Sequence, residues 1–141
     1  MLRVSEIAAT GAVGVWLGAI LFFSFVVAPR AFAVLENESA GELVEAVFPR
    51  YYSLGVTAGV VAFVAGMTRG VLDGFGLYLG MFFAAVGLGV AVALFSRLYL
   101  VPRTSDADTD DEAFERYHDL SVKLNSVMLV TVVFALVFWH V

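Results

Sequence analysis

Four long apolar runs fill most of this 141-residue chain and limit it to one kind of fold. The runs cover residues 7–27, 51–67, 75–95 and 120–141. A helix needs about 20 mostly apolar residues to cross the hydrocarbon core of a bilayer. Because no water satisfies backbone N–H and C=O groups at that depth, each run is expected to be a helix. The sequence therefore predicts an all-α integral membrane four-helix bundle that forms a single transmembrane domain over residues 1–141.

The flanking residues set the expected bounds of the spans and of their connections. The spans are predicted at about residues 6–28, 50–68, 75–100 and 114–140, and an acidic loop at 104–112. Ser39 and Glu42 form a Ser-x-x-Glu capping box, which predicts a short interfacial helix at about 40–48. Pro49 is expected to separate that helix from the second span, because proline suits the first turn of a helix.

Composition and charge exclude several classes of function. The chain is 61% hydrophobic, 15% charged and carries a net charge of -5, whereas a nucleic-acid-binding protein needs a basic surface. It contains no cysteine, so disulfides and thiolate metal sites are excluded. Its acidic balance with a single lysine suggests a salt-loving source organism. The first run exceeds the roughly 7–15 residues of a signal-peptide core, so it is expected to remain as a span.

Basic residues near the span ends predict the orientation. Lys and Arg are enriched on the cytoplasmic side of membrane proteins. Connections one and three are therefore expected in the cytoplasm and both termini outside, with the cell membrane as the location. Connections one and three carry Arg30, Arg50, Arg97, Arg103, Arg116 and Lys123, against Arg3 and Arg69 elsewhere.

Glycines four residues apart recur in the first three spans. Such pairs let two helices approach closely. They are interpreted as packing contacts inside the bundle, and the alternative is a contact between copies of the chain in a homo-oligomer. The pairs are Gly14 with Gly18, Gly55 with Gly59, and Gly76 with Gly80.

Polar residues enter the start of the last span along one helical stripe. Glu115, His118, Ser121 and Asn125 lie on this stripe, and Asn125 is the deepest. A polar side chain at that depth is costly unless it faces the bundle and finds a partner. One interpretation is interhelical hydrogen bonding that fixes packing. The other is a ligand or ion site lined by His118, Ser121 and Asn125.

Three segments in order resemble a known family. They are Trp16-Leu17-Gly18 with Phe22 to Pro29 and Phe32, then Phe48-Pro49-Arg50-Tyr51-Tyr52, then His118-x-x-Ser121-x-x-x-Asn125. Together they are similar to the transmembrane protein 205-like family, also catalogued as domain of unknown function 4149. The resemblance implies a four-span bundle in which Pro29, Phe32, Phe48, Pro49 and Tyr52 belong to the structural signature.

The leading functional hypothesis is a non-catalytic protein that binds or transports a small solute or ion at the cytoplasmic mouth of the bundle. No phosphate loop, nucleophile elbow or HExxH motif is present. One alternative is a haem- or metal-binding membrane protein that uses His118, and another is a structural or accessory subunit. The expected partners are the lipid bilayer, the solute or ion and a second copy of the chain. The candidate ligand-binding residues are Arg50, Tyr51, Arg97, Glu115, His118, Ser121 and Asn125.

Overall fold

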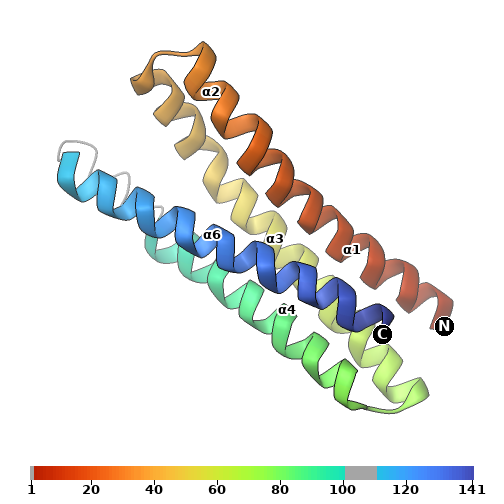
Figure 1. Ribbon diagram of the computed structural model, residues 1–141. Helices are drawn as coiled ribbons and strands as arrows, with labels where there is room; N and C mark the ends of the chain where they lie inside the picture. Colours follow the sequence, from red (N-terminus) through yellow and green to blue (C-terminus); the bar gives the residue numbers. More distant parts are fainter. Residues whose placement is uncertain (1, 101–110) are drawn as a thin grey trace.

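The computed structural model, which describes residues 2–100 and 111–141, is a bundle of four long helical rods (Figure 1). The described ranges contain no strand, so the predicted all-α class is confirmed. Most of the predicted acidic loop lies outside the described residues, as do the side chains of residues 37 and 111–115. The elements are α1 (Leu2–Phe22), the π-helical turn η1 (Phe23–Val27), α2 (Ala28–Val34), α3 (Asn37–Asp73), α4 (Leu77–Phe95), the π-helical turn η2 (Ser96–Leu100) and α6 (Asp111–His140).

All four rods are long and apolar enough to cross a membrane. The candidate spans are Leu2–Val34, Glu38–Asp73, Leu77–Leu100 and Arg116–His140. Both termini and the α3–α4 turn lie at one end of the bundle, and the α2–α3 link lies at the other (Figure 1). At 1.5 Å per residue, the 37 residues of α3 extend about 55 Å, well beyond a hydrocarbon core of about 30 Å. Helix α3 therefore projects out of the bilayer.

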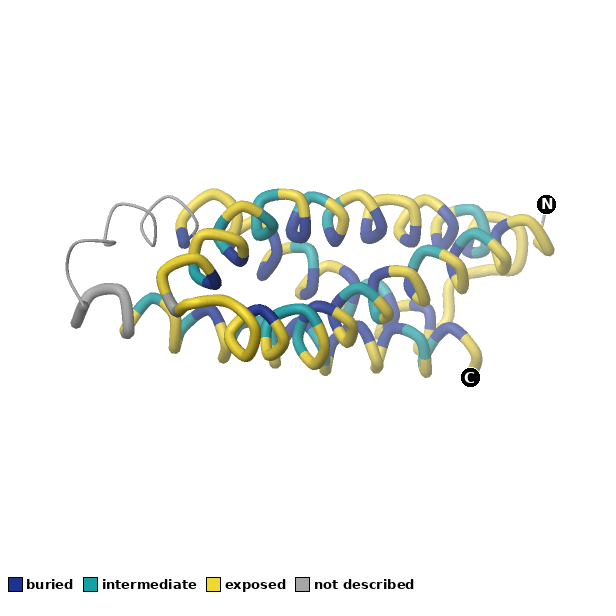
Figure 2. The backbone as a smooth tube through the Cα atoms, turned by 90° about the horizontal axis from the view of Figure 1, so that it is seen from above, coloured by how far each residue is buried: buried dark blue, intermediate teal, exposed yellow. Residues whose placement is uncertain are grey.

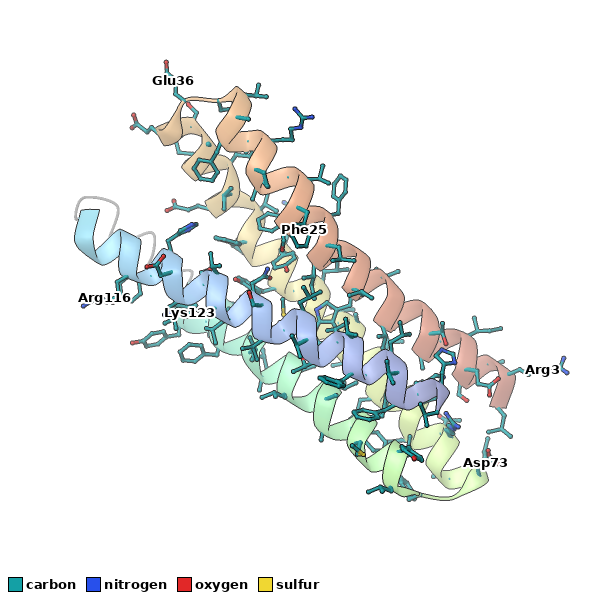
Figure 3. The ribbon with its side chains drawn as sticks, viewed as in Figure 1. Arg3, Phe25, Glu36, Asp73, Arg116 and Lys123 are labelled. Atoms are coloured by element: carbon teal, nitrogen blue, oxygen red, sulfur yellow. The ribbon has the colours of Figure 1, made fainter. Side chains whose placement is uncertain are left out.

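Charged side chains gather at the two ends, and apolar side chains cover the outside between them. Figure 3 shows Arg3 and Asp73 at the terminal end, with Glu36 and Arg116 at the opposite end. The buried residues follow the inner faces of the rods, while the outward faces are exposed (Figure 2). The outward faces carry many large apolar side chains, which in water would form an unusually extensive apolar surface. A surrounding lipid phase accounts for them.

The separate interfacial helix predicted at residues 40–48 is not found. Helix α3 begins at Asn37 after Glu36, so Ser39 is not its N-cap, and it continues through Pro49 without a break. Proline removes one backbone hydrogen bond, and in a bundle neighbouring groups can stabilise the helix around it. Val44 before the proline and Tyr52 after it are both buried in the same core, so packing holds the two segments in one helix.

Trp16 of α1 fills the centre of the bundle against glycines of two other helices. Its side chain is 2% exposed. A Cβ atom added to Gly55 would lie 2.7 Å from Trp16 Nε1, and one added to Gly89 would lie 2.8 Å from the far edge of the indole. A Cβ on Gly59 would meet Val90 as well as Trp16. The absence of side chains at these positions gives the indole its space.

The glycine pairs of α1 and of the start of α4 do not face a neighbouring helix of the same chain. An added Cβ would meet no atom within 4 Å at Gly14, Gly18, Gly76 or Gly80. Within one chain, these residues therefore make no close helix–helix contact, in contrast to the pair in α3. Whether they meet a second copy of the chain stays a prediction.

Candidate binding cleft

A cleft of about 370 Å³ lies between η1, α2, the first half of α3 and the first half of α6. It is at the end of the bundle opposite the termini, where α2 and α6 diverge (Figure 1). Among the described residues, α2 packs on α3 and makes no close approach to α6. The lining consists of Phe23, Ser24, Phe25, Ala28, Pro29 and Phe32 from η1 and α2, Val44, Phe48 and Tyr52 from α3, and His118, Ser121, Val122, Asn125, Ser126 and Leu129 from α6.

Asn125 joins three helices through its amide group. The Tyr51 hydroxyl donates a hydrogen bond to Asn125 Oδ1 at 2.5 Å, and Asn125 Nδ2 donates to Ser24 Oγ at 2.7 Å. The hydroxyls of Tyr51 and Ser24 lie near each other, so Ser24, Tyr51 and Asn125 form a polar triangle between η1, α3 and α6 that two hydrogen bonds hold through Asn125. The amide thus has partners on both neighbours, as a polar group at this depth requires. This is the interhelical hydrogen bonding that the packing interpretation predicts.

The adjacent tyrosine makes a second set of polar contacts. Tyr52 is almost fully buried, and its hydroxyl lies close to Ser121 of α6 and Ser96 of η2. Each π-helical turn therefore places a serine near one of two neighbouring tyrosines, Ser24 near Tyr51 and Ser96 near Tyr52, while the buried Ser96 Oγ itself makes no hydrogen bond. In η1 the Ala28 N–H bonds to the Phe23 carbonyl, five residues back. Such turns insert one extra residue into a helix and frequently occur at functional sites.

Stacked aromatic rings form the wall that faces the polar stripe of α6. The ring centroids of Phe23 and Tyr51 are 4.7 Å apart, and those of Phe48 and Tyr52 are 5.6 Å apart. Phe23 and Phe48 also meet, at 5.5 Å. Rings at these separations attract one another in addition to burying apolar area. The wall is therefore a connected packing unit, with the Tyr51 hydroxyl contributing to the Asn125 triangle.

The structure brings some of the predicted site residues together and leaves others apart. His118, Ser121 and Asn125 line the cleft, as do Pro29, Phe32, Phe48 and Tyr52 of the predicted signature. Tyr51 lies behind the lining and bonds to Asn125. The Glu115 side chain lies outside the described residues.

The two predicted arginines do not line the cleft. Arg97 Nε donates to Ser53 Oγ at 2.7 Å and to the Pro49 carbonyl at 3.3 Å, so it ties η2 to α3. Arg50 is exposed and is absent from the lining. Pro49 itself acts here as a backbone acceptor within α3.

The two histidines lie at opposite ends of α6. His118 lines the cleft, whereas His140 Nε2 is 3.3 Å from Thr10 Oγ1 near the chain termini. They cannot share one iron within a chain. Among the described residues, no three His, Cys, Asp or Glu side chains are grouped to hold a metal ion.

Several lining residues were not among the predicted site residues. They include Ser24, which is the only hydroxyl-bearing residue between 11 and 28 and lies four residues before Ala28. A lone serine in an apolar span was the available signal. Val122 and Ser126 follow Ser121 and Asn125 directly and are four residues apart, so they form a second stripe beside the predicted one, on which Val122 is one turn from His118.

The lipid-facing surface and the helix lengths define a four-span integral membrane protein. Within that class, the chain belongs to the family described as Domain of unknown function (DUF4149), which matches residues 11–113. An uncharacterized protein of Aquifex aeolicus (strain VF5) is 34% identical over 116 residues, which cover 82% of this chain and 81% of that protein. No solved structure matches. The family predicted from the three signature segments is therefore confirmed, and the family match ends before His118.

Proposed function

We propose that the protein binds a small ligand, with an apolar body and one or two hydrogen-bonding groups, in the cleft between η1, α2 and α6. The observation that carries this proposal is the division of the cleft into an aromatic wall and a polar stripe. Small-molecule sites are mostly apolar, contain a few convergent polar groups and occupy about 300–1,000 Å³. The volume of about 370 Å³ is at the lower end of that range.

The polar stripe has hydrogen-bonding capacity left for a ligand. An asparagine side chain offers two N–H donors and an oxygen with two lone pairs. Asn125 uses one donor on Ser24 and one lone pair on Tyr51. The same residue can therefore stabilise the helix packing and still present an N–H and a lone pair to the cleft.

The lining favours a neutral solute over an ion. Apart from His118, the described residues that line the cleft include no Asp, Glu, Lys, Arg or His. Moving a charged group out of water without an opposite charge is strongly unfavourable, whereas a neutral polar group needs only hydrogen bonds. The distribution of basic residues supports a cleft on the cytoplasmic side of the membrane.

The absence of native cysteine allows a direct test of the site. Single cysteines are introduced as Ser121→Cys, which lines the cleft, and Val133→Cys, which is on an outward face of the same helix. Both variants are placed in nanodiscs and alkylated with N-ethylmaleimide, with and without the probe 1-naphthol. The expected result is severalfold slower alkylation of the Ser121→Cys variant only. Ser126→Cys replaces it if the buried thiol reacts too slowly.

Naphthalene is the matched probe without a hydroxyl group. It should protect less well than 1-naphthol, and this difference should disappear when Asn125→Leu is added. Two results would contradict the proposal. One is equal protection of the cleft cysteine and of Val133→Cys, and the other is no protection of Ser121→Cys or of Ser126→Cys.

A further inference from the structure

We infer that the ligand is a neutral, single-tailed amphipath dissolved in the membrane, which enters the cleft sideways between η1 and α6. This inference rests on the proposed function and names the class of its ligand. Three features of the cleft support it: its opening, its depth in the membrane and the chemistry of its lining.

The opening of the cleft faces the side of the bundle. Phe25 and Val122, one from each side of the gap, are 69% and 54% exposed, although both line the cleft. Both lie within candidate membrane spans, where exposed apolar side chains contact lipid chains. The floor is closed, because Tyr52 is 1% exposed. The cleft is thus open toward acyl chains and closed toward the bundle axis.

The polar stripe lies at the depth where the head groups of amphipaths reside. Thr131 of α6 borders the central layer of Trp16 and Gly89. Asn125 is six residues from Thr131, which places it about 9 Å from that layer along the helix. His118 is thirteen residues from Thr131, which places it about 20 Å from the layer. This layer lies near the middle of all four candidate spans, so we take it as the bilayer midplane, from which the hydrocarbon extends about 15 Å to each side. The stripe therefore crosses the boundary between hydrocarbon and head groups.

The lining suits a neutral head group and one tail. The free N–H and lone pair of Asn125 fit a hydroxyl group, which both donates and accepts. An ammonium head would have no Asp or Glu partner among the described lining residues. A carboxylate would have only His118, which lies seven residues from Asn125, about 10 Å along the helix. Phe25 and Leu129 offer apolar contacts to a tail. A cleft of about 370 Å³ holds a head group and part of one chain, whereas a two-tailed phospholipid is too bulky.

The test uses two photoreactive probes that share a diazirine-bearing twelve-carbon tail: dodecanol and dodecanoate. The full-length protein in phosphatidylcholine nanodiscs is irradiated with each probe, and labelled positions are mapped by mass spectrometry. Dodecanol should label residues 23–32 and 118–129, and excess unlabelled dodecanol should compete. Dodecanoate should label these segments several times less. Even labelling of the exposed apolar residues of all four rods, or equal labelling by both probes, would overturn the inference.

Two matched substitutions test the sideways route. Val122→Trp places a large side chain in the opening, and Val133→Trp places the same side chain on an outward face of α6 away from the cleft. Both positions are exposed, so both variants should fold. Dodecanol labelling should fall severalfold for Val122→Trp and stay unchanged for Val133→Trp. Equal labelling of the two variants would exclude entry between η1 and α6.

The two proposals fail in distinguishable ways. If 1-naphthol protects the Ser121→Cys variant but dodecanol does not label the cleft, the amphipath inference is wrong and the binding site stands. If neither probe acts at the cleft, both proposals are wrong.

Discussion

The hydrogen bond between Tyr51 and Asn125 predicts measurable coupling between two helices. The variants are Tyr51→Phe, Asn125→Ala and the double substitution, which form a double-mutant cycle. Interhelical hydrogen bonds in membrane proteins average about 0.6 kcal/mol and reach about 1.7 kcal/mol. The 2.5 Å distance is at the short end for O–H···O bonds, so the coupling is expected in the upper half of that range. Asn125→Ala alone should cost about 1–3 kcal/mol, because it removes a second bond, to Ser24.

The assay is reversible unfolding in mixed micelles with increasing dodecyl sulfate. Fluorescence of Trp16 and Trp139, both buried in the folded bundle, reports the transition. The control is Ser126→Ala, because that hydroxyl bonds to the Val122 carbonyl of its own helix. It should change the free energy of unfolding by less than about 0.5 kcal/mol. If the costs of Tyr51→Phe and Asn125→Ala simply add in the double variant, the triangle does not stabilise the bundle.

Two further predictions concern the packing of the rods. Gly89→Ala should lower the free energy of unfolding by about 1–3 kcal/mol in the same titration, because its Cβ would press on Trp16. Gly80→Ala, whose Cβ would meet no atom within 4 Å, should not destabilise, and equal losses would show that this packing is wrong. Pro49→Ala should leave the helix content in circular dichroism unchanged and raise stability, because it restores a backbone donor inside α3. A marked gain in helix content would instead indicate that α3 is broken at this residue.

The four spans were predictable because the bilayer itself sets their length and composition. The continuity of α3 was not, because the sequence signal of Pro49 is the same at a helix start and inside a packed helix. Val44 before the proline and Tyr52 after it pack in one core, and this packing, which the sequence does not show, keeps the helix continuous. Spacing alone also could not tell the glycine pair facing Trp16 from the outward pairs, because that depends on how each helix is rotated.

The candidate site was predictable on α6 and much less so elsewhere. Helical spacing placed His118, Ser121 and Asn125 on one stripe, and all three line the cleft. The partner Ser24 lies about 100 residues away on a π-helical turn, and no local pattern identifies that turn. Arg97 was included for its charge, yet it donates hydrogen bonds to Pro49 and Ser53 of α3, and none of these three residues lines the cleft.

Alkylation of the Ser121→Cys variant, compared with Val133→Cys, tests most directly whether the cleft is a binding site. With 1-naphthol present in nanodiscs, alkylation at the cleft position should slow severalfold while the outward position keeps its rate. The effect should exceed that of naphthalene, because only the hydroxyl can bond to Asn125. Unchanged rates at both positions would show that the polar stripe serves helix packing alone.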